Sequence, residues 1–335
     1  MRKALVFLPL VVLLGTIQSA ESIQPAGRPP TGAPSTPAVA SAGFSLERLA
    51  RIDGALQKYV DEGRVAGAVA LVLRDGQPVY ERAFGWSDKE AGRRMAADSL
   101  FRIASQTKSM TSAAILSLVE EGKIGLNDPA GRFILGCIVE RASGLPLDQF
   151  IRTRITGPLG MKDTNFFVPP TERNRLSAVY ASGSEGTIIR APEGSKGQGD
   201  YVEGPRRSFA GGAGLVSTAR DYARFLEMIR NGGVLGGARI LAPRTVALMT
   251  TNQVGSMHST TGLGYGLGFE TTDRYGANGM DLARSLRLGW GLRHAVSCGS
   301  SGATGHGADD PVDAQPHRHP NHVPQSGLSG IDGVA

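Results

Sequence analysis

Ser105 and Lys108 are the residues whose types and spacing most directly indicate chemistry. They form a Ser-x-x-Lys tetrad at the start of an apolar segment with helical periodicity. Residues three apart on a helix share a face, with Cβ atoms roughly 5–6 Å apart, so the lysine amine can reach the serine hydroxyl. A serine becomes a nucleophile when a base takes its proton, and a lysine amine is such a base where burial lowers its pKa. We interpret Ser105 as a nucleophile and Lys108 as its proton acceptor, with no cofactor.

The residues around the tetrad distinguish this interpretation from a chance match. Isolated tetrads of this type occur about once in a chain this long and usually mark an exposed helix start. Here the sequence DSLFRIA precedes Ser105, and ILSLVEEGKIGLNDP follows from Ile115. These flanks resemble the penicillin-recognising serine hydrolases, in particular the branch of class C β-lactamases, D-alanyl-D-alanine peptidases and esterases. The resemblance covers about residues 45–290, with a gap.

The resemblance implies an α+β fold of the β-lactamase/transpeptidase type, with a helical region packed on an antiparallel sheet and the serine between them. The periodicity of the chain predicts its elements separately. We expect helices at 44–63, 105–121, 135–142 and 147–154, a helix capped by Ser217 or Thr218, strands at 66–74 and 79–86 joined at Asp75-Gly76, a loop at 181–200 and a strand at 264–270.

Two further segments are candidates for substrate contact. Ala210 opens the run AGGAGLVST, which is not a phosphate loop because no Gly-Lys-Ser/Thr follows it. The family has a similar glycine stretch beside its pocket, so the resemblance implies that Gly211, Gly212 and Gly214 bind substrate. It also implies that Trp290 and Gly291 are a remnant of the family's third motif, whose strand supplies the second oxyanion donor.

The family pattern breaks at Ile134 and Leu135. Relatives carry a long segment between the two matching regions, and it contains a Tyr-x-Asn motif whose tyrosine assists proton transfer. This chain has no Tyr-x-Asn, and Tyr180, Tyr201 and Tyr222 do not match the motif. We infer that several dozen residues are missing between 134 and 135.

The pattern breaks again after Gly291. Residues 292–335 contain five of the six histidines and no strand periodicity. If the first base of codon 292 is dropped and the wobble bases are free, the tail can read CGTPFRVDPRERLVTVLMTQ, which resembles the closing strands of the family. We therefore favour a frameshifted, disordered tail over a metal site, although four histidines invite one: His306, His317, His319 and His322.

The N-terminus has the pattern of a secretory signal over residues 1–20. Arg2 and Lys3 precede an apolar run at 4–14, and Ser19 and Ala20 offer cleavage points. Residues 21–43 form a flexible leader rich in Pro, Ala and Ser, and 44–291 the hydrolase domain. The apolar run is too short to span a bilayer, so we expect a periplasmic or extracellular protein without a stable membrane anchor.

Composition excludes several partners. The 335-residue chain carries a net charge of +6, but its lysines and arginines are scattered, which argues against nucleic-acid binding. Cys137 and Cys298 are its only cysteines, too few for a disulfide framework. We expect a monomer that acts on a small molecule or a cell-wall peptide.

The function predicted from these observations is acyl transfer by a secreted serine hydrolase. The substrate is a β-lactam, an ester or a D-Ala-D-Ala-type amide, and both breaks in the pattern predict impaired activity. The alternative is a catalytically dead pseudoenzyme or a ligand-binding remnant of the same family. A metal-binding tail protein is the third interpretation, and it requires stoichiometric zinc.

Overall fold

The computed structural model describes residues 11–14, 44–128, 135–183, 187–192, 200–204, 209–277, 286–288 and 295–298. All of them belong to one unit, Met1–Ser301, which is separate from Gly302–Ala335. The described helices and helical turns are α1 (Leu46–Asp61), η1 (Ala104–Gln106), α2 (Thr107–Glu120), α3 (Leu135–Ser143), α4 (Leu147–Ile151), the π-helical turn η2 (Arg152–Thr156), η3 (Pro170–Arg175), α5 (Ala219–Arg230), α6 (Pro243–Met249) and η5 (Gly255–Met257).

The strands form one large sheet and three small two-stranded ones. The large sheet has the order β11-β12-β13-β14-β1-β2-β3-β4, and the small sheets pair β5 with β8, β6 with β7, and β9 with β10. The strands are β1 (Val11–Leu14), β2 (Gly67–Arg74), β3 (Gln77–Asp88), β4 (Arg93–Arg94), β5 (Phe101–Arg102), β6 (Tyr180–Ser182), β7 (Ile188–Arg190), β8 (Val216–Ser217), β9 (Val234–Leu235), β10 (Ala238–Arg239), β11 (Leu263–Tyr265), β12 (Glu270–Thr272), β13 (Leu286–Leu288) and β14 (Ala295–Cys298). Helices packed on a mainly antiparallel sheet confirm the predicted α+β class.

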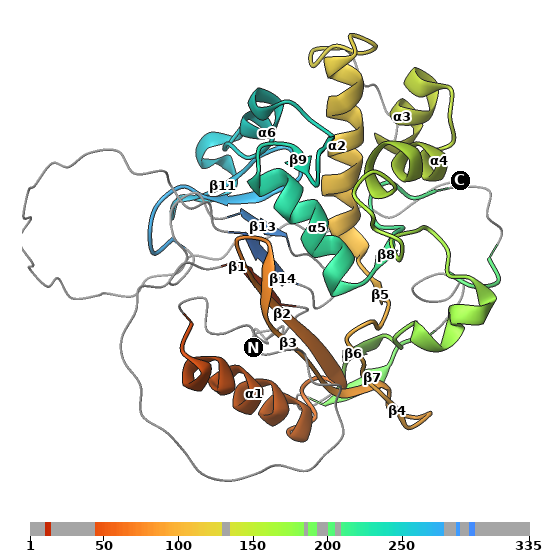
Figure 1. Ribbon diagram of the computed structural model, residues 1–335, viewed down its shortest axis with the longest axis vertical. Helices are drawn as coiled ribbons and strands as arrows, with labels where there is room; N and C mark the ends of the chain where they lie inside the picture. Colours follow the sequence, from red (N-terminus) through yellow and green to blue (C-terminus); the bar gives the residue numbers. More distant parts are fainter. Residues whose placement is uncertain are drawn as a thin grey trace, which may run out of the picture. The chain divides into compact units, whose positions relative to one another are not determined.

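Strand β2 is buried on both faces and divides the core into two layers (Figure 1). Val69, Leu71 and Leu73 pack with the side of the sheet that α2 and α5 cover. The alternate residues, such as Ala70 and Val72, pack against α1. This period of two is the expected geometry of a strand, and it places α1 opposite the helices that carry the candidate site.

The first helix and the hairpin follow the sequence prediction. Ser45 caps α1 by accepting a hydrogen bond from the Arg48 N–H at 3.3 Å. The turn between β2 and β3 consists of Asp75 and Gly76, with φ values of 51° and 76°. Asp and Gly both tolerate this left-handed conformation, which suits the twist of a two-residue hairpin turn.

Helix α2 is largely buried. Its buried residues include Met110, Ala113, Leu116 and Leu118, and one stripe of the helix, which includes Ser112 and Ile115, is half-buried. Its side chains pack against α3, α4, η2 and α5 within one hydrophobic core. A helix with most of its surface buried is a core helix, and this one fixes the position of the tetrad at its N-terminus.

Two expectations about local structure are wrong. The segment at 181–200, expected as a loop, contributes to the β6–β7 hairpin, in which Ala181 pairs with Ile189. The single strand expected at 264–270 is two strands, β11 and β12, joined by a turn. Gly268 has a φ of 101°, and the Gly266 N–H donates to the Phe269 carbonyl at 2.8 Å. A glycine in this conformation reverses the chain where a continuous strand cannot.

The two ends of the domain supply strands that the sequence did not predict. Val11–Leu14, from the predicted signal, forms β1 and pairs in parallel with both β14 and β2. Ala295–Cys298, from the predicted disordered tail, forms β14 and pairs antiparallel with β13. Apolar or β-branched segments can satisfy the backbone groups of an open sheet edge even where their own periodicity is weak. The disordered tail predicted for 292–335 is therefore corrected at these four residues.

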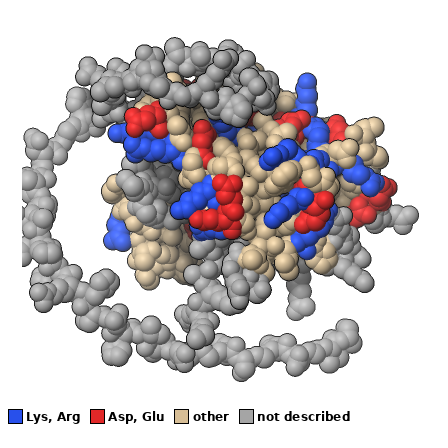
Figure 2. Space-filling model, turned by 90° about the horizontal axis from the view of Figure 1, so that it is seen from below, with Lys and Arg blue, Asp and Glu red and all other residues tan. Residues whose placement is uncertain are grey.

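None of the described helices is both long and apolar enough to cross a membrane. The face of the molecule in Figure 2 carries basic and acidic side chains interspersed, with no continuous basic surface. This distribution agrees with the scattered charges of the sequence.

Truncation separates the two parts of the predicted tail. A chain that ends at Ser301 should keep the melting temperature of the full chain, because residues 302–335 form a separate unit. A chain that ends at Gly291 lacks β14, the partner of both β13 and β1, and should melt at least about 3 °C lower. Differential scanning calorimetry of the three chains measures this. Equal melting temperatures for both truncations would show that β14 adds nothing to the sheet.

Candidate active site

The candidate nucleophile lies at an unusual turn of the backbone. Ser105 follows Ala104, whose φ of 44° is in the left-handed region that alanine rarely adopts. This conformation costs a non-glycine residue about 1–2 kcal/mol, and such strain persists only where the surroundings impose it. Two backbone bonds do so here, because Ile103 N–H donates to the Leu215 carbonyl and Gln106 N–H to the Ile103 carbonyl, both at 3.0 Å.

The sharp turn brings the two residues of the tetrad together. Lys108 Nζ donates to Ser105 Oγ at 2.7 Å and to the Gly212 carbonyl at 3.0 Å. Both side chains are half-buried. Among the residues that the structure describes, no carboxylate forms an ion pair with Lys108. The amine is therefore held by the nucleophile and one backbone carbonyl, so its proton exchange is directed to Ser105.

The three candidate glycines have different positions in one loop. Gly212 supplies the carbonyl that binds Lys108, and a Cβ built on it meets no atom within 4 Å. The Gly211 carbonyl accepts from Thr111 Oγ1 at 2.7 Å, which ties the loop to α2. A Cβ on Gly214 would lie 2.8 Å from the Ala210 carbonyl oxygen and 3.0 Å from Phe166. Gly212 thus contacts Lys108 directly, whereas Gly211 and Gly214 are placed to hold the loop.

A buried network of hydrogen bonds holds the backbone next to Ser105. The Tyr222 hydroxyl donates to the Gln106 carbonyl at 3.0 Å and shares a 2.8 Å hydrogen bond with Ser109 Oγ. Ser109 Oγ in turn contacts the same carbonyl at 2.8 Å. Sequence reasoning missed this network, because no motif marks Tyr222 or Ser109, and it missed the strained Ala104. The only sequence feature that points to this network is the position of Ser109, one helical turn after Ser105.

None of the tyrosines considered in the sequence takes the place of the missing motif. Burial raises the pKa of Tyr222 well above its usual range, so its phenol stays neutral in the network under α2. Burial also raises the pKa of Tyr201, whose hydroxyl contacts the Ala213 carbonyl at 3.4 Å. Burial and the hydrogen bond to Glu90 raise the pKa of Tyr180 to about 12. Each hydroxyl has a partner other than Ser105 or Lys108.

The Ser105 backbone N–H is available as one oxyanion donor. It lies in the short helical turn η1, where the first N–H groups have no partner within the helix. The predicted second donor lies beside Trp290 and Gly291, and both residues lie outside the described segments, in the connection between β13 and β14. The four histidines of the alternative metal site lie outside them as well. The described segments contain no group of three or more His, Cys, Asp or Glu placed to hold a metal ion.

This arrangement can perform nucleophilic acyl transfer. One N–H of Lys108 donates to the Gly212 carbonyl, and the amine lies 2.7 Å from Ser105 Oγ, close enough to exchange a proton with the hydroxyl. The Ser105 N–H can then stabilise the oxyanion that forms when Oγ attacks a carbonyl carbon.

Two glycine substitutions test the loop assignment as a matched pair. Gly214→Ala should destabilise the fold by about 1–3 kcal/mol, because its Cβ meets a backbone carbonyl and a packed ring. Gly212→Ala should leave the free energy of unfolding within about 0.5 kcal/mol of the parent, because the space is open. Urea denaturation measures both values. A larger loss for Gly212→Ala than for Gly214→Ala would contradict the loop geometry.

This chain is similar to known hydrolases. The esterase EstB of Burkholderia gladioli is 28% identical over 327 residues, which covers 68% of this chain and 81% of the esterase. A putative D-alanyl-D-alanine carboxypeptidase of Salmonella schwarzengrund is 23% identical over 67% of this chain and 73% of that protein. The solved structure of EstCE1, a hydrolase with promiscuous acyltransferase activity, superposes with a TM-score of 0.61 at 22% identity. It covers 72% of this chain and 87% of EstCE1.

The Beta-lactamase family model matches residues 52–134 and 130–309. The two pieces meet where the sequence predicts a missing segment, and the second continues past Gly291, where the predicted hydrolase domain ends. The resemblance inferred from the tetrad and its flanks is confirmed by this match. The catalytic geometry and the match over most of the chain lead to one conclusion: this chain belongs to the β-lactamase family of serine hydrolases.

Proposed function

We propose that this protein hydrolyses small carboxylic esters through an acyl-enzyme on Ser105, at a rate well below that of intact members of its family. The observation that carries the proposal is the 2.7 Å contact between Lys108 Nζ and Ser105 Oγ, with the Gly212 carbonyl as the second partner of the amine. An ester is the preferred substrate because EstB is matched over more of its length and at higher identity than the putative carboxypeptidase.

The reaction follows from the positions of these atoms. Ser105 Oγ forms a bond to the ester carbonyl carbon while its proton passes to Lys108 Nζ. The Ser105 N–H stabilises the oxyanion, and the intermediate then expels the alcohol oxygen, which takes the proton from Lys108. Lys108 next takes a proton from water, the hydroxide attacks the acyl carbon, and Ser105 leaves with the proton restored. No charge or proton is left over at the end of the cycle.

The low rate follows from the groups that the described site lacks. A proton-transferring tyrosine has no counterpart beside Ser105, and general acid–base assistance contributes roughly 10²–10⁴ in rate. The described site has one oxyanion donor, whereas such enzymes usually have two. The loss of one donor lowers the reaction rate by a factor of about 10²–10³. The alignment with EstB supports a missing segment, because 327 aligned residues that cover only 68% of a 335-residue chain include parts of the esterase without a counterpart here.

The alternative function is a non-catalytic ligand-binding remnant, and the same missing tyrosine favours it. We also propose that the chain is exported, on the pattern of residues 1–20, and that cleavage there removes β1 and leaves β14 paired with β13 alone. The N-terminal sequence of the exported protein should then begin at Glu21, and an intact Met1 on exported material would contradict this.

Hydrolysis of p-nitrophenyl butyrate by the purified chain tests the proposed function. We expect slow release of p-nitrophenolate that Ser105→Ala and Lys108→Ala each reduce to the uncatalysed rate, since one removes the nucleophile and the other the proton acceptor. Lys89→Ala is the matched control, because Lys89 is an exposed lysine in the turn between β3 and β4 and contacts neither residue of the tetrad. It should keep the parent rate.

Three outcomes separate the alternatives. Ser105-dependent ester hydrolysis that exceeds hydrolysis of the β-lactam nitrocefin supports the esterase proposal. Unchanged release in Ser105→Ala would rule out Ser105 as the nucleophile. No Ser105-dependent release from a folded chain would favour the ligand-binding remnant.

A further inference from the structure

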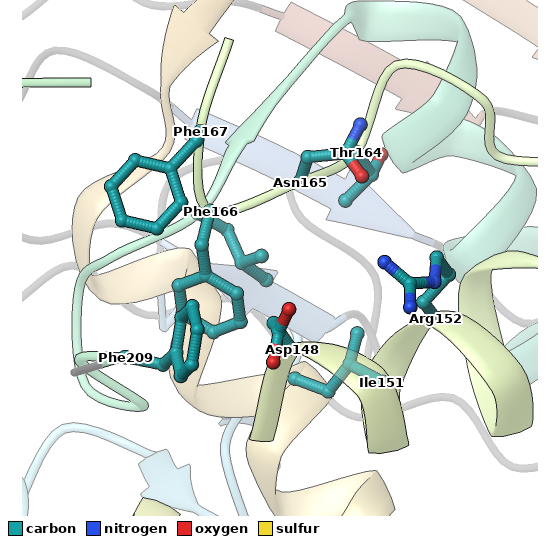
Figure 3. Close-up of a pocket in the computed structure, with 9 residues that line it drawn as sticks. Asp148, Ile151, Arg152, Thr164, Asn165, Phe166, Phe167 and Phe209 are labelled. Carbon is teal, nitrogen blue, oxygen red and sulfur yellow. The ribbon is translucent and has the colours of Figure 1, made fainter. Parts of the chain in front are cut away.

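A cavity lies beside α4 and η2, next to the two ends of the glycine loop. It has a volume of about 220 Å³, and its walls come from α4, the segment at 164–167, Phe209 and Leu215 (Figure 3). Neither Ser105 nor Lys108 lines it. Sites for drug-sized molecules usually measure roughly 300–1,000 Å³, so a ligand here must be smaller.

One wall of the cavity carries a carboxylate without a partner. Asp148 is half-buried, its Oδ1 has no contact with solvent, and the atom has no hydrogen-bond partner among the described residues. Buried polar atoms are almost always hydrogen-bonded, and an unsatisfied one costs about 1–3 kcal/mol. Asp148 lines the cavity, so a rotation of its carboxylate would bring this oxygen to a ligand that donates a hydrogen bond, and that bond would remove the cost.

A guanidinium group lines the same cavity one helical turn after Asp148. Arg152 is exposed, and Figure 3 shows its guanidinium directed toward the cavity that Asp148 also lines. Residues four apart on a helix normally lie within ion-pair distance. Here Arg152 begins the π-helical turn η2, and no ion pair joins it to Asp148 or to any other described residue. Turns of this kind are frequent at functional sites. The carboxylate of Asp148 and the guanidinium of Arg152 thus form no ion pair with each other, and each can bind an opposite charge on a ligand.

The remaining wall is aromatic. Phe166, Phe167 and Phe209 form an edge-to-face cluster, with ring centroids 5.2 Å apart for Phe166 and Phe209 and 6.0 Å apart for Phe167 and Phe209. Figure 3 shows the cluster on the side of the cavity away from Arg152. The rings provide apolar area for a side chain, and aromatic faces also attract a cation held by Asp148.

We propose that this cavity binds a small zwitterion with an apolar side chain, that is, an α-amino acid or a closely similar compound. The ammonium group donates to Asp148, the carboxylate accepts from the Arg152 guanidinium, and the side chain packs on the three phenylalanines. The ligand carries one positive and one negative group, which pair with Asp148 and Arg152. A simple amine pairs only with Asp148, and a simple acid only with Arg152. This site is independent of the hydrolytic reaction.

Isothermal titration calorimetry of the full chain with three probes tests the proposal. Phenylalanine carries both charges, 2-phenylethylamine only the ammonium, and 3-phenylpropanoate only the carboxylate. We expect phenylalanine to bind at least about tenfold more tightly than either analogue, since each charge-assisted hydrogen bond is worth that factor or more. Equal affinities for the three probes, or no binding of phenylalanine at roughly millimolar concentration, would overturn the proposal.

Variants test whether Asp148 binds the ammonium group of the ligand and Arg152 its carboxylate. Asp148→Asn should remove the preference for phenylalanine over 3-phenylpropanoate and keep its preference over 2-phenylethylamine, and Arg152→Gln should do the reverse. Asp61→Asn and Arg244→Gln, which change an exposed carboxylate on α1 and an exposed arginine on α6, are the matched controls and should change neither preference. Ser105→Ala should bind phenylalanine like the parent. Loss of binding in Ser105→Ala, with binding kept in Asp148→Asn, would place the ligand at the catalytic pair and contradict the proposal.

Discussion

The contact between Lys108 and Ser105 depends on the burial of α2. A helix buried over most of its surface cannot rotate or shift without breaking core contacts, so the residues at its first turn keep a fixed separation. Two backbone hydrogen bonds beside α2 hold the left-handed backbone of Ala104, and Ser105 Oγ meets the amine one turn later. The Tyr222 network under α2 fixes the Gln106 carbonyl. Core packing, backbone strain and buried hydrogen bonds therefore all help to fix the 2.7 Å distance between Lys108 Nζ and Ser105 Oγ.

The glycine loop connects this pair to a second region of the molecule. Its Gly212 carbonyl orients the Lys108 amine, while Phe209 before it and Leu215 after it line the cavity with the unpaired charges. The sheet on the other side of α2 and α5 is completed by β1 and β14, which come from segments outside the predicted hydrolase domain. The parallel pairing of β1 in an otherwise antiparallel sheet marks the position where this chain departs from its predicted architecture.

The sequence predicted the elements that have strong local signals. The period of α1, the Asp75-Gly76 turn and the Ser-x-x-Lys spacing each reflect short-range physics, and the structure has all three. Features set by packing were not predictable. The left-handed Ala104 has no sequence signature, Tyr222 meets Gln106 across 116 positions of the chain, and Asp148 looks like an ordinary first-turn acid until its surroundings are known. Strands β1 and β14 were missed because pairing at an open edge, and not periodicity, decides their conformation.

Peptide mapping after reaction with a fluorophosphonate tests the central claim most directly, because the adduct accumulates even when acylation is slow. Trypsin cleaves after Arg102 and Lys108, and the released peptide IASQTK contains Ser105 as its only serine. The account predicts that tandem mass spectrometry finds the phosphonyl group on Ser105 and that Lys108→Ala abolishes the adduct. A folded chain that reacts at another residue, or that reacts at Ser105 equally fast without Lys108, would contradict the claim that the lysine activates this serine.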